Sequence, residues 1–246
     1  MQAFKESLQA LIQFLTDPIG IIVLIIVGVI IYKVYARKQE LDEEPPSITM
    51  IGDSIVAGFG LEQDMTMYLQ EKRPRWLVID RGVIGLSIKS LANGYKEPFK
   101  DAPPEYYPLG SQPPFSDVKI TTKYVLVQLG GNDAIELLDP LLYKAYLDDV
   151  VGHIIAQGAI PIYTGIVDFT PTGGVITQKA KEHRAVLNDV MLRHSLKHKA
   201  IFLDWGNLTN NNEDTIDGIH RTQEANNYLA RTIIEAIERT KNKRQA

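Results

Sequence analysis

The chain of 246 residues contains no cysteine, and this absence removes several kinds of site at once. Without a thiol there is no disulfide, no thiolate metal site and no cysteine nucleophile. The compartment stays open, because a protein without cysteine suits either side of a membrane. An excess of positive charge is also lacking, since the net charge is −4 at pH 7. Nucleic-acid binding depends on a basic face, so we expect no nucleic-acid partner.

Long apolar runs are scarce, and the one that stands out lies near the amino terminus. Residues 18–32 carry no charge and are mostly Ile, Val and Leu. Such a run is just long enough for a bilayer core, which takes roughly 17 to 25 residues. The tyrosines and basic residues at its end are typical of a membrane interface, although a buried core strand or helix is the alternative. We predict one transmembrane helix that contacts the membrane through residues 18–35.

The segments on either side of this run complete the predicted anchor. Residues 1–17 have apolar side chains at helical spacing, which indicates a short amphipathic helix. A cleaved signal peptide is an alternative, but Lys33 between the apolar run and the nearest small residues favours retention. We assign residues 1–38 to the anchor of a single-pass cell-membrane protein, the inner membrane if the source is a bacterium. The membrane face of the remaining chain stays open.

The acidic stretch 39–46 ends in two prolines and is interpreted as a solvated linker, so the globular domain is expected to span 47–246. Short, continuously apolar runs alternate there with amphipathic segments, which predicts an α/β domain of three layers around a doubly wound, parallel, five-stranded sheet. The expected strands are 48–51, 76–79, 124–129, 160–163 and 201–203. The expected helices are 65–72, 87–93, 140–156, 178–194 and 222–241.

One segment of the domain lacks any period. Residues 95–119 are rich in proline and include the aromatic side chains of Tyr106, Tyr107 and Phe115. A structureless stretch of this length in a compact domain is usually functional or disordered. We interpret it as a flap near a cleft, with a plain surface loop as the alternative.

Four short blocks follow the ends of predicted strands, and we call them the polar blocks because three of them carry polar side chains. They are 52–54 after the first strand, 82–85 after the second, 130–133 after the third and 217–220 before the last helix. Because parallel strands end at one edge of a sheet, and ligands bind there, the fold is expected to gather these blocks at one rim.

The chemistry of the blocks is complementary. Ser54 is a poor nucleophile unless a base takes its proton, and His220 is the candidate base. Asp217, three residues earlier, can hold the imidazole in the correct tautomer and stabilise its charged form. Each residue also has a plainer interpretation: a turn at Ser54, a cap of the last helix by Asp217, a surface histidine at 220.

An oxyanion formed by attack on a carbonyl needs donors already in place. The candidates are the backbone N–H groups of Ser54 and Gly85 and the side-chain amide of Asn132. Glycine at 85 allows the backbone to approach closely. The plainer interpretation of Asn132 is that it stabilises a turn through its own backbone.

These blocks resemble those of the SGNH or GDSL hydrolases, in particular the thioesterase, arylesterase and lysophospholipase branch. The matching segments are residues 51–61, 78–85, 129–133 and 217–220, and the resemblance spans about residues 47–240. It implies a flavodoxin-like sheet, ester hydrolysis without a metal or other cofactor, a Ser54, His220 and Asp217 triad, and an oxyanion hole of Ser54, Gly85 and Asn132. Two departures affect the expected substrate: Arg221 replaces the usual proline, and the 95–119 insertion is long.

Two other candidates are weaker. His194 and His198 lie four residues apart on a predicted helix, a spacing that can chelate a metal, but no third ligand is evident in the sequence. Residues 168–174 follow the fourth strand and are interpreted as a cleft-edge loop, because they lack the lysine of a phosphate-binding loop.

The sequence therefore predicts a membrane-anchored serine hydrolase that cleaves carboxylic ester or thioester bonds of a small-molecule or lipid substrate. An O-acetylesterase or acyltransferase acting on a cell-envelope glycan is the alternative within the same chemistry. A catalytically inactive, membrane-tethered binding protein on a hydrolase fold is the alternative of another class. Oligomeric state is not determined by the sequence.

Overall fold

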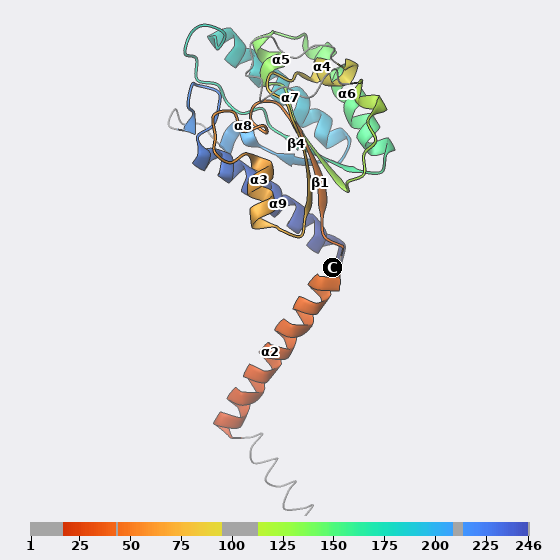
Figure 1. The fold of residues 1–246 in the computed structure, drawn as a ribbon, viewed down its shortest axis with the longest axis vertical. Coiled ribbons are helices and arrows are strands. Elements are labelled where there is room, and N and C mark those ends of the chain that lie inside the picture. Colours follow the sequence, from red (N-terminus) through yellow and green to blue (C-terminus); the bar gives the residue numbers. More distant parts are fainter. Residues whose placement is uncertain (1–16, 43, 95–112, 209–213, 246) are drawn as a thin grey trace, which may run out of the picture. The chain divides into compact units, whose positions relative to one another are not determined.

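The computed structural model describes residues 17–42, 44–94, 113–208 and 214–245 (Figure 1). The amphipathic helix predicted for 1–17 and most of the predicted loop 95–119 lie outside these residues. The chain divides into two compact units, Met1–Pro45 and Pro46–Ala246.

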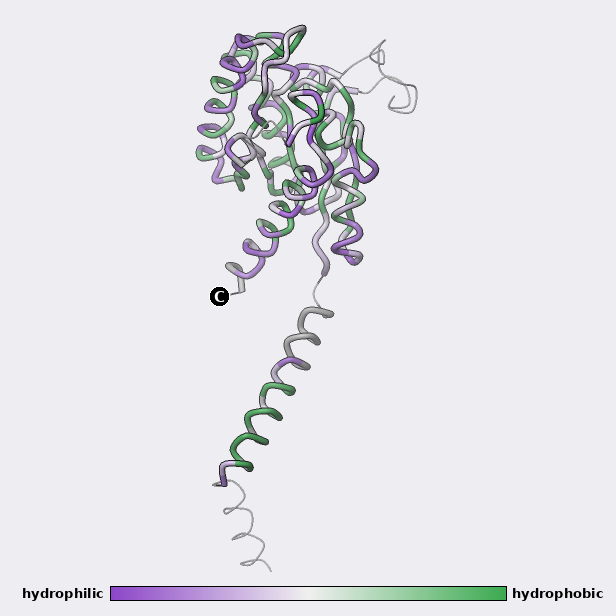
Figure 2. The backbone as a smooth tube through the Cα atoms, turned by 90° about the vertical axis from the view of Figure 1, so that its left-hand side faces the viewer, coloured by the Kyte–Doolittle hydropathy of each residue, from purple (hydrophilic) through white to green (hydrophobic). Residues whose placement is uncertain are grey.

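In the first unit, helix α2 spans Pro18–Asp42. Its apolar turns, green in Figure 2, expose many isoleucine and valine side chains, including Ile25 and Ile31. The helix continues through the first half of the predicted linker, because Lys, Arg, Gln and Glu are good helix formers. Among the described helices, none combines the length and the apolar character needed to cross a membrane, so the predicted transmembrane helix is not confirmed.

The second unit is built on a parallel sheet with the strand order β2-β1-β3-β4-β5. The order reverses beside β1, so the chain winds outward in both directions from the first strand, as a doubly wound sheet requires. The strands are β1 (Ser47–Gly52), β2 (Leu77–Gly82), β3 (Tyr124–Gln128), β4 (Ile160–Thr164) and β5 (Ile201–Leu203). The prediction of a five-stranded parallel α/β sheet is confirmed.

Helices cover both faces of the sheet, as Figure 1 shows. Asp139 caps α6, because its carboxylate accepts from the backbone N–H groups of Leu141 and Leu142 at 2.8 and 3.2 Å. The helices of this unit are α3 (Met65–Lys72), α4 (Ile88–Asn93), α5 (Gly131–Ile135), α6 (Pro140–Ala156), α7 (Gln178–Lys197), α8 (Trp205–Leu208) and α9 (Gln223–Gln245), with a 3-10 turn, η2, at Phe115–Asp117.

One expectation about these elements is wrong, and one element was not predicted. Continuously apolar runs are typical of strands buried on both faces, but β2 is largely exposed or half-buried because it is an edge strand. The block 130–133, for which no helix was predicted, enters the short helix α5 at Gly131. Its short length gives no helical period that a sequence reading could detect.

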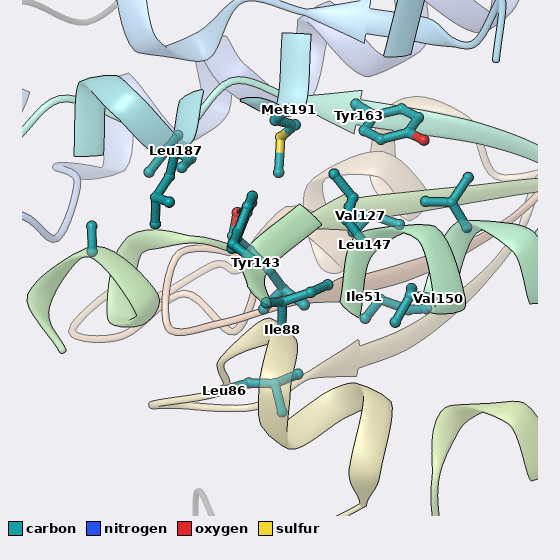
Figure 3. Close-up of a cluster of buried hydrophobic side chains, with 14 of the residues drawn as sticks. Ile51, Leu86, Ile88, Val127, Tyr143, Leu147, Val150, Tyr163, Leu187 and Met191 are labelled. Carbon is teal, nitrogen blue, oxygen red and sulfur yellow. Dashed lines mark hydrogen bonds between the residues drawn. The ribbon is translucent and has the colours of Figure 1, made fainter. Parts of the chain in front are cut away.

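Two apolar clusters lie on the opposite faces of the sheet. One contains residues of α3 and α9, and the other contains residues of α4, α6 and α7. Figure 3 shows the second cluster, in which Leu187 and Met191 of α7 lie near Tyr143 of α6 and Ile88 of α4. These clusters fix the strand ends on which the polar blocks lie.

Candidate active site

The turn after β1 holds Ser54 at the carboxyl edge of the sheet. Asp53 shapes this turn, since its Oδ1 accepts from the backbone N–H of Ile55 at 2.9 Å. The side chain of Val56 folds back over Gly52, where an added Cβ would lie 2.3 Å from Val56 Cγ2. A glycine is therefore needed at 52 for the turn to close so tightly. Ser54 itself is 8% exposed.

A second tight loop, residues 215–221, carries the histidine. Asp217 organises it, because its Oδ1 accepts from the backbone N–H groups of Ile219 at 3.1 Å and His220 at 2.9 Å. The backbone N–H of Ile216 donates to the carbonyl of His220 at 2.8 Å and closes the loop. Gly218 has a φ of +97°, in the left-handed region that glycine adopts without strain.

The two loops bring the hydroxyl, imidazole and carboxylate into one relay. His220 Nε2 lies 2.9 Å from Ser54 Oγ, and His220 Nδ1 lies 2.6 Å from Asp217 Oδ2. With the proton on Nδ1, that nitrogen donates to Asp217, and Nε2 is free to accept from the serine hydroxyl. This is the arrangement that removes a proton from a serine as it attacks a carbonyl.

The surroundings keep the Asp217 carboxylate ionised and the ring in place. Partial burial acts to raise the pKa of Asp217, but hydrogen bonds from the side chain and backbone of His220 outweigh it, so the pKa is lowered. The ring of Phe59 packs against the imidazole with centroids 4.4 Å apart. Phe59 was not singled out in the sequence, and its position in the Ser54 turn is the signal that would have suggested it.

The predicted oxyanion donors follow strands that end in register. Gly52 pairs with Gly82 of β2 and with Gln128 of β3. Beyond these ends, Asn132 Nδ2 donates to the carbonyl of Leu86 at 3.1 Å, which ties the Asn132 block to the turn containing Gly85. Gly85 has a φ of +76°. Since an amide carries two N–H groups, the bond to Leu86 leaves the second one of Asn132 for another acceptor.

Two buried carboxyl groups, those of Asp53 and Asp133, support these turns. Neither residue was assigned a role of its own from the sequence. Asp133 is fully buried and its two oxygens accept from the backbone N–H of Ile88, which fixes the start of α4. Burial raises the pKa of Asp133 to about 7 and that of Asp53 to about 6. Both residues belong to the polar blocks, and both are buried and accept hydrogen bonds from backbone N–H groups. We therefore interpret them as residues that stabilise the turns.

Several of the plainer interpretations do not agree with these contacts. The last helix is capped by Thr222, whose Oγ1 accepts from the backbone N–H of Ala225 at 3.3 Å, and not by Asp217. Asn132 binds the carbonyl of Leu86 and not its own backbone. His220 is half-buried between Ser54 and Phe59.

Arg221, the departure from the usual proline, is buried behind this loop. Its guanidinium donates from Nη2 to the carbonyl of Asp168 at 2.5 Å. The Asp168 carboxylate in turn pairs with Lys181 and Arg184, each at 2.9 Å. The neighbouring Thr170 donates its backbone N–H to the carbonyl of Gly218 at 2.8 Å. The predicted cleft-edge loop 168–174 thus packs directly against the histidine loop.

A cavity of about 300 Å³ lies beside the Gly85 turn, and its lining is partly apolar and partly polar, with Asp80 and Arg81 among its residues. Its described lining includes Gly82, Val83 and Leu86, and the backbone N–H of Val83 donates to the carbonyl of Gly52, two residues before Ser54. Among the described lining residues, neither Ser54 nor His220 is present. The wall of the cavity is therefore joined to the end of β1 that precedes Ser54, and the relay is not part of the described lining.

The structure brings a third metal-binding side chain to His194 and His198, which was not evident in the sequence. Asp148 of α6 approaches both histidines, at 2.8 and 3.9 Å. These three residues are the group in the described part of the chain that could hold a metal ion.

Solved structures share this fold at low sequence identity. The carbohydrate acetylesterase Est24 from Sinorhizobium meliloti is 14% identical with a TM-score of 0.61, over 79% of this chain and 99% of that chain. The aryl esterase of M. smegmatis is 16% identical with a TM-score of 0.59, over 78% and 98%. The esterase EstA from Pseudoalteromonas sp. is 18% identical with a TM-score of 0.57, over 80% and 98%.

No curated protein matches the chain at a significant level. The model of the GDSL-like lipase/acylhydrolase family matches residues 50–227, a segment that contains all four polar blocks and most of the chain. The resemblance noted from the sequence is confirmed, and the chain belongs to the GDSL-like lipase/acylhydrolase family.

Proposed function

We propose that the protein is a serine hydrolase that cleaves carboxylic ester or thioester bonds through an acyl-enzyme on Ser54. Its family is one of ester-hydrolysing enzymes. The observation that carries the assignment of roles is the relay itself, with 2.9 Å between Ser54 Oγ and His220 Nε2 and 2.6 Å between His220 Nδ1 and Asp217 Oδ2.

In the first half-reaction, Ser54 Oγ attacks the carbonyl carbon while its proton moves to His220 Nε2. The carbonyl oxygen becomes an oxyanion that accepts from the backbone N–H groups of Ser54 and Gly85 and from the second amide N–H of Asn132. Collapse of this intermediate breaks the ester bond, and the proton on His220 passes to the leaving alcohol or thiol. The acyl group remains on Ser54.

In the second half-reaction, water replaces the leaving group. His220 takes a proton from the water as its oxygen attacks the acyl carbon, and the same donors stabilise the second oxyanion. The bond between Ser54 Oγ and the acyl carbon then breaks. Oγ recovers the proton from His220, and a carboxylic acid leaves. Asp217 stays ionised throughout and stabilises the charged imidazole. Attack by an alcohol in place of water would give acyl transfer.

Fluorophosphonate labelling tests this assignment directly. We expect the folded protein to react at Ser54 in one-to-one stoichiometry, detected by mass spectrometry of the labelled peptide, because the relay makes Oγ nucleophilic. Ser54→Ala and heat-denatured wild-type protein serve as controls and should not be labelled. A folded wild-type protein that hydrolyses p-nitrophenyl esters without labelling at Ser54 would contradict the proposal.

We favour acyl substrates of a lysophospholipase or arylesterase kind over acetyl groups. The support is the cavity next to the Gly85 turn, where apolar side chains such as Ile51, Leu86 and Phe115 offer a surface for an alkyl or aryl group. A series of p-nitrophenyl esters separates the two: kcat/KM should rise from acetate toward medium-chain esters. Activity restricted to acetate would instead favour an O-acetylesterase of a cell-envelope glycan.

The competing hypothesis of an inactive binding protein requires His220 to point away from Ser54. The 2.9 Å contact argues against it. A folded protein that is not labelled at Ser54 and turns over no ester or thioester would favour it.

We also propose that the protein associates with a membrane through residues 18–35. What supports this is α2, whose isoleucines and valines are exposed on every side of the helix, since such a surface is stable only when something apolar covers it. The face of the membrane on which the hydrolase lies is left open by this proposal.

A further inference from the structure

Away from the relay, three side chains with metal-binding atoms meet between α6 and α7. His194 and His198 occupy the end of α7, and Asp148 approaches from α6. This end of α7 lies just before β5, at the amino ends of the strands, whereas Ser54 and His220 lie at the carboxyl ends. The catalytic proposal makes no use of the cluster.

The spacing of the three groups is close to that of a metal site. Asp148 Oδ1 lies 2.8 Å from His194 Nε2 and 3.9 Å from His198 Nε2, and the three ligand atoms are all within 4.8 Å of one another. Ligand atoms around a tetrahedral Zn²⁺ with bonds of about 2.0 to 2.1 Å are roughly 3.3 Å apart. The two Asp148 distances differ from this spacing by about half an ångström, and the ligand atoms of the two histidines lie within 4.8 Å of each other.

An unsatisfied atom also points to a missing partner. His198 Nε2 is buried and has no hydrogen-bond partner among the described residues. Buried polar atoms are normally paired, so each exception needs an explanation. A metal ion between the two imidazoles and the carboxylate would supply the missing partner.

The groups behind the ligands have the arrangement of an outer shell. Tyr163 Oη lies 2.7 Å from His194 Nδ1, so its hydroxyl orients the ring and leaves Nε2 toward Asp148 (Figure 3 shows Tyr163). Lys144 donates to Asp148 Oδ2 at 2.5 Å, which leaves Oδ1 as the ligand oxygen. Lys197 lies 3.4 Å from that oxygen, but its side chain is 60% exposed and can turn into solvent.

We propose that Asp148, His194 and His198 bind one divalent transition metal ion, of which Zn²⁺ fits best, and that the ion joins α6 to α7. Two imidazoles and one carboxylate are ligands that Zn²⁺ accepts, and water completes the fourth position. His198, one-quarter exposed, gives the ion a route from solvent. An ion bound only by the folded chain stabilises it.

The test uses the full chain after removal of metal with a chelator. We expect one Zn²⁺ per chain by isothermal titration calorimetry and a higher Tm with Zn²⁺ present. Addition of Co²⁺ should give the visible absorption bands of a four-coordinate site. A wild-type chain that binds no stoichiometric Zn²⁺ and shows no such bands would overturn the proposal.

Two substitutions on α7 separate this cluster from other zinc-binding groups. Loss of a residue that only supports a metal ligand usually lowers the metal affinity by about 10- to 100-fold. His198→Gln removes a ligand itself, so its Zn²⁺ affinity should fall by at least that much. His183→Gln, on the same helix but paired with the carbonyl of Leu138, is the matched control and should bind Zn²⁺ like the wild type. Both apo variants are first compared with the wild type by circular dichroism. An unchanged Zn²⁺ affinity in a folded His198→Gln protein would overturn the proposal.

Tyr163→Phe tests the outer shell. Loss of its hydroxyl leaves His194 Nδ1 without the contact that orients the ring, so the Zn²⁺ affinity should fall by about 10-fold while the stoichiometry stays at one. An unchanged affinity would show that the ring is not held for an ion, and would contradict the proposed site.

Discussion

At the scale of single residues, Asp217 makes three hydrogen bonds that hold His220, one from the ring and two from backbone N–H groups of its own loop. It therefore sets both the position and the tautomer of the imidazole. Because the two residues are only three apart, this part of the relay is local and depends on the loop more than on the sheet.

Asp217→Asn separates the two roles. Asparagine can still accept from the loop backbone, but its amide group cannot stabilise a charged imidazole. We expect kcat for p-nitrophenyl esters to fall by about 10²- to 10⁴-fold with little change in KM. Asp139→Asn, at the cap of α6, is the control and should leave kcat unchanged. A kcat within a factor of about three of the wild type would contradict the role of Asp217.

Asp133 gives a prediction for stability. Its pKa is raised by burial to about 7, so the folded chain holds this proton at a pH where the unfolded chain has lost it. Protonated Asp133 therefore contributes to the free energy of unfolding. This contribution is fully present below about pH 4 and is lost as the pH rises to about 7, and the free energy of unfolding falls by up to about 1.4 kcal/mol per pH unit in between. Asp53, with a pKa of about 6, adds in the same direction.

Asp133→Asn should remove the part of the pH dependence of the free energy of unfolding that Asp133 causes. The asparagine keeps an acceptor for the backbone N–H of Ile88. Urea unfolding at a series of pH values from about 4 to 8 measures it, and the variant should lose less stability than the wild type as the pH rises. Exposed Asp139→Asn controls for the change in net charge. Parallel curves for the wild type and Asp133→Asn would contradict the assignment.

At the scale of elements, the histidine loop depends on its contact with the loop after β4. Arg221 is 2% exposed and donates to the carbonyl of Asp168, whose carboxylate is held by two basic residues of α7. Arg221 touches no reacting atom in the proposed reaction, so it is a positioning residue for His220.

Arg221→Met should misplace His220 relative to Ser54. We expect kcat to fall by about 10- to 100-fold, because a shift of about 1 Å costs up to 10²-fold in rate. Arg221→Lys should not restore it, since an ammonium lacks the planar fork of the guanidinium. Arg73→Met, which breaks an exposed pair with Glu238, is the control and should leave kcat unchanged. An equal effect of Arg73→Met and Arg221→Met on kcat would contradict the positioning role.

At the scale of the whole molecule, the two units differ in what they need to be stable. The unit Pro46–Ala246 contains both apolar clusters and the complete sheet. The helix α2 exposes its apolar side chains instead. The proposed membrane contact would cover the apolar side chains of α2, whereas the second unit has an apolar core of its own.

Removal of residues 1–45 should leave a folded and active hydrolase. We expect an unchanged kcat/KM for soluble p-nitrophenyl esters, because no group of the relay comes from the deleted part. The full chain should sediment with membranes or bind vesicles, and the truncated one should remain in the supernatant. If the full chain also stays in the supernatant, the membrane association is wrong while the hydrolase assignment stands.

The sequence alone determined the α/β class, the number of strands and their places along the chain, and the candidate residues of the relay. Apolar runs mark buried strands directly, and the turn chemistry of Gly52, Asp53 and Ser54 is encoded in adjacent residues. Asp217 and His220 are likewise neighbours in the chain. These features depend on local pattern, which a sequence carries in full.

Only the tertiary structure decided which distant groups meet. Three contacts join residues that are far apart in the chain: Ser54 with His220 at 2.9 Å, Arg221 with Asp168, and Asp148 with His194. The burial of Asp133 also depends on distant parts of the chain. Edge or central position of a strand is settled in the same way, as β2 shows. The physical reason is that burial and long-range contacts arise from the packing of helices on the sheet, and no local pattern specifies them.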